Sequence, residues 1–297
     1  MQNGEGARPV PDFVIAGAAK CGTTALYTYL STHPEIAMSA RKETYFWCPD
    51  VPVPDAIRDL AAYRATWRAG AERRLRGEAT PAYLRSAVAA SAILAANPAA
   101  KFLVLLRDPT EMAASYHAQL VFSLQENEAD LARAWALQAA RREGRGVPAA
   151  CHFAPDLQYG AVCALGDQLE RMAGVVPTGQ LKVVLLDDLG RDARATYRGV
   201  LDFLGLPDDG RSDFAAVNRN RRRRALPLVR LARRVAVASP VGRARLSGLV
   251  DRLSLDETPR APLDPALALY LRRYFLPQVE KLEALLGRDL RDWKPAG

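Results

Sequence analysis

One stretch near the amino terminus, residues 13–27, constrains the fold more than any other part of the chain. It runs from a short apolar segment, typical of a buried strand, through a loop bounded by Gly17 and Gly22. Thr23 and Thr24 then open a helix, whose N-terminus favours anions. The glycine spacing is that of a P-loop, where backbone N–H groups turn inward around a phosphate. The stretch predicts a strand–loop–helix phosphate cradle, with an ordinary turn capped by threonine as the structural alternative.

The lysine of this loop does not stand where a nucleoside triphosphatase needs it. Such a loop ends in Gly-Lys-Ser/Thr, but here Thr23 follows Gly22 and the lysine is Lys20. A phosphorylated nucleotide is still indicated, whereas Mg-ATP chemistry is not. A P-loop kinase remains an alternative that ATP turnover would support. A cysteine phosphatase built on Cys21 needs an arginine after five intervening residues, and Tyr27 stands there instead.

Composition limits the class of protein. The chain has 297 residues, 49% of them hydrophobic and 25% charged, which suits one large α/β domain with a helical appendage. Its net charge of +8 indicates an anionic partner. The four cysteines show neither a Cys-x-x-Cys pair nor zinc-ligand spacing, so we predict free thiols, a reducing compartment and no metal. Without a long apolar run, the protein is predicted to be cytoplasmic.

A second informative stretch, residues 101–117, combines an apolar run with a basic residue at its end. The apolar run predicts a strand buried on both faces, as in a parallel sheet. Arg107 follows it directly, and Asp108 and Pro109 break the strand before a helix that carries Ser115. Arg107 can bind a phosphate through two hydrogen bonds while Ser115 adds a hydroxyl. An ion pair between Arg107 and Asp108 that caps the turn is the alternative.

An acidic residue beside an aromatic run is a candidate general base. Lys42 and Glu43 precede the aromatic residues 45–47 in a segment that we predict to be extended. Neighbours on a strand point to opposite faces, so one side chain of the pair can face a cleft while the other faces solvent. A solvated surface pair is the alternative interpretation.

Strand and helix patterns alternate through much of the chain. This alternation predicts an α/β fold of P-loop type, a three-layer αβα arrangement with a central parallel sheet and extra C-terminal helices. Residues 121–142 are predicted to form one long helical stretch. We predict a single domain over residues 1–297, with three parts. These are a nucleotide-binding core at 13–206, a basic helical insert or lid at 219–262, and C-terminal helices at 263–297.

The most basic part of the chain, residues 219–224, includes Arg221 and Arg222 in a run of four arginines. Such a run is typical of a solvated surface, with a nucleic-acid or lipid patch as an alternative. Residues 226–253 combine apolar residues with arginines in a basic amphipathic pattern. That pattern can lie on a membrane surface or cover an apolar acceptor, and a helical lid packed on the core is the plainer interpretation.

Together these motifs resemble the sulfotransferase family that depends on 3′-phosphoadenosine 5′-phosphosulfate (PAPS). Residues 17–24 are similar to the 5′-phosphosulfate loop of that family, and Arg107 with Ser115 is similar to its 3′-phosphate motif. Glu43 stands at a position similar to the catalytic base of the heparan sulfate and related bacterial sulfotransferases. The two phosphate motifs follow each other in the order that the family has.

The resemblance extends over most of the chain. Residues 77–83 match as well, although heparan sulfate 3-O-type members often carry a lysine where this chain has Ala79. That departure argues against a heparan-like acceptor and leaves donor binding intact. The second half, from Tyr159 to Trp293, also resembles these enzymes, whereas residues 219–262 match poorly.

The resemblance implies a metal-free reaction in which a sulfuryl group leaves PAPS, and 3′-phosphoadenosine 5′-phosphate (PAP) is the product. Its 5′-phosphosulfate site would consist of five consecutive residues, namely Lys20, Cys21, Gly22, Thr23 and Thr24. Arg107 and Ser115 would hold the 3′-phosphate, and family members close a basic loop over it, which we place at Arg221 and Arg222.

Catalysis of such a transfer rests on positioning and electrostatic stabilisation. Lys20 would stabilise the negative charge that develops on the leaving phosphate. Glu43 would remove the proton of the acceptor, and His117, on the helix after the phosphate motif, is the reserve candidate for this base.

We predict that the acceptor is a small molecule, a lipid or a saccharide, modified at a hydroxyl or an amine. Composition favours a bacterial enzyme of small-molecule or natural-product modification, with no nucleic-acid partner and a peripheral membrane contact through residues 226–253 as an option. The alternative from another class is a non-enzymatic anion, nucleic-acid or membrane binder that uses the arginine run. Its affinity would fall steeply with salt and survive the loss of Lys20 and Arg107.

Overall fold

The computed structural model describes most of the chain. The described residues are 11–70, 72–215, 222–223, 255–256 and 262–295. Within these ranges, no helix combines the length and the apolar character needed to span a bilayer.

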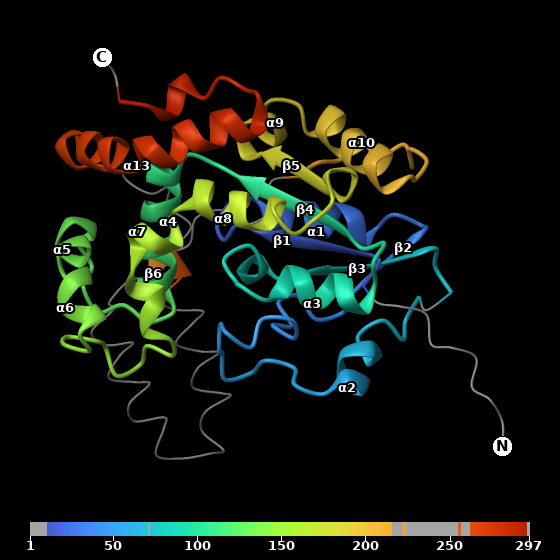
Figure 1. The fold of residues 1–297 in the computed structure, drawn as a ribbon, viewed down its shortest axis with the longest axis horizontal. Helices are drawn as coiled ribbons and strands as arrows, with labels where there is room; N and C mark the ends of the chain where they lie inside the picture. The colour runs from blue at the N-terminus through green and yellow to red at the C-terminus, as the bar shows by residue number, and fades with distance from the viewer. Residues whose placement is uncertain (1–10, 71, 216–221, 224–254, 257–261, 296–297) are drawn as a thin grey trace.

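A five-stranded parallel sheet forms the centre of the protein (Figure 1). Its strands, in spatial order, are β2 (Ile36–Met38), β3 (Leu75–Ala79), β1 (Phe13–Gly17), β4 (Lys101–Leu106) and β5 (Leu181–Leu185). All neighbouring strands pair in parallel. Every residue of β1 is buried, as is all of β4 except its first residue, which is the burial that a strand covered on both faces requires. The predicted α/β fold with a central parallel sheet is confirmed.

Helices cover the sheet. The α-helices of the core are α1 (Thr23–Ser31), α2 (Leu60–Ala65), α3 (Ala89–Ala96), α4 (Pro109–Phe122), α5 (Leu131–Ala136), α6 (Gln138–Arg142), α7 (Tyr159–Val162), α8 (Leu165–Ala173), α9 (Leu186–Arg191) and α10 (Ala193–Leu204). Short 3₁₀ turns are η1 (Pro81–Tyr83), η2 (Ala154–Leu157), η3 (Thr178–Gln180) and η4 (Arg291–Trp293). The long α13 (Pro265–Leu286) packs against α8 and α4, so the C-terminal helix closes over the core (Figure 1).

The helix that follows β4 begins where the sequence predicts. Pro109 occupies its first turn, and the side chain of Asp108 accepts a hydrogen bond from the amide of Thr110 at 2.8 Å. Proline fits a first turn because its missing N–H would lack a helical partner there anyway. This cap fixes the direction in which α4 leaves the sheet, and therefore the position of every side chain along it.

The prediction of one long helical stretch over residues 121–142 is wrong. α4 ends at Phe122, and Leu124 adopts a left-handed backbone with φ of 66°. The chain becomes helical again only at α5, where the side chain of Asp130 accepts from the amide of Arg133 at 2.9 Å. The turn between these helices is stabilised by contacts with distant residues, which a local pattern does not reveal.

The predicted basic insert at 219–262 falls largely outside the described residues. Within it the structure describes two short strands, β6 (Arg222–Arg223) and β7 (Leu255–Asp256), which pair antiparallel, and β6 lies against α4. Arg221 and the amphipathic segment 226–253 lie outside the described residues. The division of the chain into three parts of one domain stays a prediction.

Candidate active site

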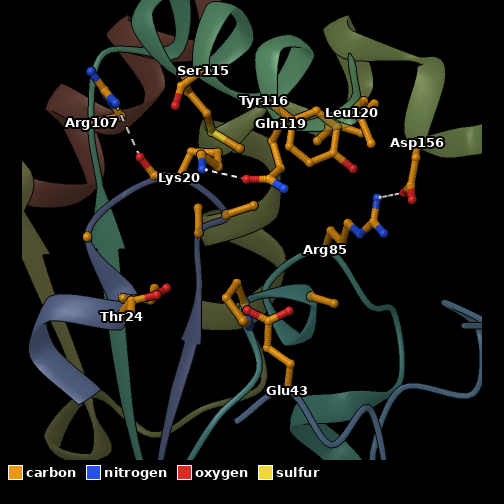
Figure 2. Close-up of a pocket in the computed structure, with 18 of the residues that line it drawn as sticks. Lys20, Thr24, Glu43, Arg85, Arg107, Ser115, Tyr116, Gln119, Leu120 and Asp156 are labelled. Atoms are coloured by element: carbon orange, nitrogen blue, oxygen red, sulfur yellow. Dashed lines mark hydrogen bonds and ion pairs between the residues drawn. The ribbon is translucent and has the colours of Figure 1, made fainter. Parts of the chain in front are cut away.

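A cavity of about 550 Å³ opens at the carboxyl ends of the central strands (Figure 2). One side is formed by the loop after β1 and by Arg107, which directly follows β4. α4 contributes a row of side chains, and the turn after β3 and the segment that carries Glu43 complete the wall. Ligands of open α/β sheets bind at this edge, where loops from neighbouring strands meet.

The loop after β1 has the features of a phosphate cradle. A Cβ atom on Gly17 would come within 2.4 Å of the Leu84 Cβ, and Gly22 has a φ of 89°. Within the described part of the chain, no backbone carbonyl accepts the amide protons of Gly22, Thr23 and Thr24. Three free amides at the start of a helix fit an anion such as a phosphate or a phosphosulfate.

Lys20 stands inside this loop in a left-handed conformation, with φ of 63°. Its Nζ donates a hydrogen bond to Oε1 of Gln119 on α4 at 3.1 Å. Burial, together with the nearby positive charge of Arg107, lowers the pKa of Lys20. The side chain therefore crosses the cavity from the loop to the helix (Figure 2).

The second phosphate motif meets the first in the same cavity. Arg107 donates from Nη1 to the carbonyl oxygen of Lys20 at 3.3 Å, and its Nη2 lies 3.6 Å from a carboxylate oxygen of Glu111. Ser115 also lines the cavity and is largely buried. The predicted ion pair between Arg107 and Asp108 is not formed, since Asp108 accepts from Thr110 and lies 3.7 Å from Nη2 of Arg272.

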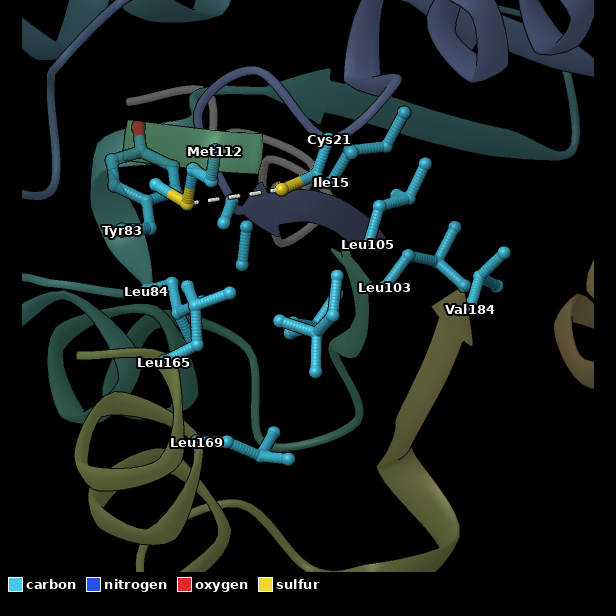
Figure 3. Close-up of a cluster of buried hydrophobic side chains, with 14 of the residues drawn as sticks. Ile15, Cys21, Tyr83, Leu84, Leu103, Leu105, Met112, Leu165, Leu169 and Val184 are labelled. Carbon is cyan, nitrogen blue, oxygen red and sulfur yellow. Dashed lines mark hydrogen bonds between the residues drawn. The ribbon is translucent and has the colours of Figure 1, made fainter. Parts of the chain in front are cut away.

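Cys21 does not face the cavity. Its thiol lies among buried apolar side chains, 4.0 Å from the sulfur of Met112, and donates to the carbonyl of Ala19 (Figure 3). Burial raises the pKa of Cys21 to about 12. Its amide donates to the Ala18 carbonyl at 3.3 Å, so that this N–H, which we assigned to the phosphate site, is used inside the turn. A neutral, buried thiol packs and does not act as a nucleophile.

Glu43 lines the cavity, but the prediction that it lies on a strand is wrong. β2 ends at Met38, and Glu43 and Tyr45 both have left-handed backbones, with φ of 63° and 53°. Consequently Lys42 and Glu43 do not face opposite sides: both line the cavity and they form an ion pair. The hydroxyl of Tyr45 donates to Oε2 of Glu43 at 3.3 Å.

His117 is not among the residues that line this cavity. It is buried on α4, its Nε2 lies 2.9 Å from the carbonyl oxygen of Glu128, and its ring meets the edge of Tyr159. Burial lowers its pKa. A ring enclosed in this way packs the helix against its neighbours, so we do not carry the reserve base forward.

Several cavity residues were missed in the sequence. Gln119 follows Ser115 by one helical turn, a spacing that could have revealed it. Arg85 and Asp156 also line the cavity and form an ion pair at 2.6 Å, although 70 residues of sequence separate them (Figure 2). Nothing in the local pattern pairs these two residues. The described residues contain no group of three or more His, Cys, Asp or Glu that could hold a metal ion. That the protein uses no metal remains a prediction.

Comparison with known proteins places this arrangement in a family. The family described as "Sulfotransferase domain" matches residues 10–215, which is more than half of the chain. The chain belongs to the sulfotransferase domain family. Its fold agrees with this assignment. The crystal structure of a sulfotransferase from Alicyclobacillus acidocaldarius aligns with a TM-score of 0.73 and 28% identity, covering 96% of this chain and 99% of that one.

Curated sulfotransferases match over shorter regions. The membrane-associated sulfotransferase kil1 of Dictyostelium discoideum is 34% identical over 39% of this chain and 24% of its own length. The heparan sulfate glucosamine 3-O-sulfotransferase 3A1 of Mus musculus is 27% identical over 68% of this chain and 47% of its own length. The chain thus spans about a quarter of the length of the first relative and about half of the length of the second. The resemblance carried by the two phosphate motifs is confirmed at the level of the family.

Proposed function

We propose that this protein transfers a sulfuryl group from PAPS to a hydroxyl or amine of a small-molecule, lipid or saccharide acceptor. The observation that carries the proposal is the meeting of Lys20, Arg107 and Glu43 in one cavity. These residues lie in three separate segments of the chain, and the cavity unites an anion cradle, two cations and a carboxylate. Family membership supports the same reaction class.

The donor would bind at the loop side of the cavity. The free amides of Gly22, Thr23 and Thr24 would donate hydrogen bonds to the 5′-phosphosulfate, with the two threonine hydroxyls beside them. Arg107 and Ser115 would hold the 3′-phosphate, since a guanidinium matches phosphate with two parallel hydrogen bonds. Arg107 is only partly exposed and is held at the carbonyl of Lys20 by a long, weak contact, which leaves it able to turn toward a phosphate.

Lys20 would then act on the leaving group of the transfer, and Glu43 on the acceptor. Lys20 would stabilise the charge that appears on the departing phosphate, a role suited to a largely buried cation. Glu43 would accept the proton of the acceptor; its side chain is 40% exposed and in contact with Lys42 and Tyr45. In the ligand-free geometry Lys20 donates to Gln119, and this contact would be exchanged for one with the donor.

The acceptor side of the cavity has balanced charges. Arg85 is paired with Asp156 and Lys42 with Glu43, so that among the described residues of this wall each of these cations has an acidic partner. Paired charges favour an acceptor that is uncharged close to the reacting atom, because a charged one would have to separate a pair. The location in the cell stays a prediction.

Calorimetry with PAP tests the donor site. The intact protein is expected to bind PAP, and Arg107→Ala is expected to weaken binding by roughly 10- to 100-fold, since hydrogen bonds to charged groups contribute about 1.5–3 kcal/mol. Arg145→Ala serves as the control, because Arg145 is 70% exposed and pairs with Glu143 away from the cavity. Failure of the intact chain to bind PAP would overturn the proposed function.

Turnover of Glu43→Gln tests the base. Its rate is expected to fall by roughly 10²–10⁴, the usual contribution of general-base catalysis, with PAP affinity unchanged. Turnover is measured with labelled PAPS and an acceptor identified by screening. Near-normal turnover in Glu43→Gln with intact PAP binding would exclude Glu43 as the base.

A further inference from the structure

The segment that carries Glu43 has an unusual backbone on both sides of Thr44. Glu43 and Tyr45 are left-handed, a conformation that residues with a Cβ atom adopt rarely and that surrounding contacts must hold. The amide of Glu43 donates to the carbonyl of Ala79 at 2.8 Å, and the carbonyl of Thr44 accepts from the amide of Ile57 at 2.9 Å. Backbone contacts on both sides of this peptide therefore hold the segment that carries Glu43.

What holds the Thr44 side chain is a buried carboxylate. Glu78, near the end of β3, is completely buried and takes no part in the cavity lining. Its Oε1 accepts from the hydroxyls of Thr44 at 2.5 Å, Thr80 at 2.6 Å and Tyr83 at 2.6 Å. Its Oε2 accepts from the hydroxyl of Tyr63 at 2.5 Å. Four hydroxyls from three segments thus converge on one side chain.

A buried acidic residue without a cationic partner is costly, and four charge-assisted hydrogen bonds offset that cost only in part. An apolar side chain would fill the same space at the end of a strand more cheaply. The carboxylate has one property that an apolar residue lacks: it fixes hydroxyls by direction as well as by contact. Of the four hydroxyls, that of Thr44 belongs to the residue next to the proposed base.

We propose that Glu78 is a positioning residue of the reaction, which holds the Thr44 hydroxyl and thereby aims the Glu43 carboxylate into the cavity. The inference rests on the proposed role of Glu43 as the base. Glu78 and Thr44 do not touch the reacting atoms, because neither lines the cavity. Their effect is on the geometry of Glu43, and errors of about 1 Å in such geometry cost up to roughly 10²-fold in rate.

The chain offers a matched pair of variants for the test. Thr44 and Thr80 are both fully buried and both donate to the same oxygen of Glu78. Thr44 adjoins Glu43 in the chain, whereas Thr80 follows Ala79, whose backbone carbonyl accepts from the Glu43 amide and is unchanged by a substitution of the Thr80 side chain. Thr44→Val and Thr80→Val each remove one hydroxyl without changing the shape of the side chain. A purely structural role of the cluster predicts the same consequence for both variants.

The experiment measures kcat, KM for PAPS and PAP affinity for Thr44→Val, Thr80→Val and Thr44→Ser. We expect kcat of Thr44→Val to fall by about tenfold or more with PAP affinity unchanged, and Thr44→Ser to restore it because serine keeps the hydroxyl. Thr80→Val is expected to keep kcat within about threefold, since the geometry of Glu43 is not disturbed. Thermal unfolding is recorded for each variant, so that rates are compared below every unfolding transition.

Two results would overturn the inference. Equal losses of kcat in the two valine variants would make the cluster a structural one, and an unchanged kcat in Thr44→Val would show that the hydroxyl does not aim Glu43. Glu43→Gln, assayed beside them, separates this inference from the proposed function. If Glu43→Gln retains turnover, the assignment of the base fails first; if it is inactive while the valine variants behave alike, only the positioning role of Glu78 fails.

Discussion

Glu78 and Glu126 are both completely buried, yet the fold accommodates their charges in different ways. Glu126 faces a guanidinium: Arg141, whose side chain is also fully buried, donates to its two carboxylate oxygens at 2.6 and 2.7 Å. Tyr159 adds a hydroxyl at 2.5 Å. Among the residues that the structure describes, Glu78 has only hydroxyl partners. The difference appears in the pKa values, because burial raises the pKa of both and only the contacts of Glu126 reverse it.

The ion pair around Glu126 and the hydroxyl cluster around Glu78 differ in what they hold in place. The pair of Glu126 and Arg141 ties the turn after α4 to α6, and Glu126 also accepts from the amides of Asn127 and Glu128 at 2.7 Å. Such a pair is rigid, because a guanidinium can only donate. Hydroxyls donate and accept, so the partners of Glu78 can change roles when that side chain is replaced, although in the native protein all four donate to it. The ion pair fastens a turn, whereas the hydroxyl cluster lies behind the proposed base.

Breaking the ion pair is expected to have the largest effect. Arg141→Met leaves the buried carboxylate of Glu126 without its cation, and we expect a loss of about 3–5 kcal/mol in the free energy of unfolding. Urea unfolding followed by circular dichroism measures it. Arg145→Met is the control, since its pair with Glu143 is exposed and contributes about 0–1 kcal/mol. A loss below about 1 kcal/mol in Arg141→Met would contradict the importance of this pair.

Replacing the hydroxyl-bound carboxylate should cost less. Glu78→Gln keeps the shape of the side chain, and its hydroxyl partners can rotate to accept from the new amide. We therefore expect a loss of about 1–3 kcal/mol in the free energy of unfolding. Glu126→Gln places an amide against a donor-only guanidinium and leaves Arg141 with an uncompensated charge, so its loss should be the larger one. The same urea titrations compare the two variants. Equal losses would remove the distinction between the clusters.

The smallest effect concerns pH. Glu126 has a lowered pKa, so its contribution to stability is complete above the ordinary value of 4.5 and is lost as the pH falls below it. Glu78 has a raised pKa, so its contribution falls as the pH rises from 4.5 through its folded value. The free energy of unfolding that Glu126→Gln loses relative to wild type should therefore become smaller at low pH. The free energy that Glu78→Gln loses should become smaller as the pH rises. Each slope is at most about 1.4 kcal/mol per pH unit, and slopes of the same sign would contradict the assignment.

The sequence predicts the strands and turns on the loop side of the cavity well because its signals there are local. The glycines of the first loop, the turn at Asp108 and Pro109, and the strand before Arg107 each lie within a few residues of what they determine. These stretches alone indicate an α/β fold and the meeting of two phosphate motifs at one sheet edge. The roles of the individual residues stay predictions.

The other side of the cavity depends on contacts between distant residues. The turn that contains Glu126 interrupts the predicted helix, and the ion pair of Glu126 with Arg141 stabilises this turn. We propose that the left-handed conformation of Glu43 depends on the contact of Thr44 with Glu78. No spacing rule connects such residues. Glu78 did carry one signal, an acidic residue inside a strand whose neighbours are small, but its partners could be identified only in three dimensions.

The way the cavity is assembled has a consequence for how such proteins diversify. The wall that we propose for the donor is the start of α1 and α4, packed against the sheet, while Lys42 and Val53 come from connecting segments and Asp156 from the short turn η2. Gly17 and Gly22 leave no room for a side chain in the loop after β1. Connecting segments tolerate substitution and insertion far better than packed elements. If the proposed function holds, new acceptors can be acquired, or engineered, by exchanging these segments while the proposed donor site stays in place.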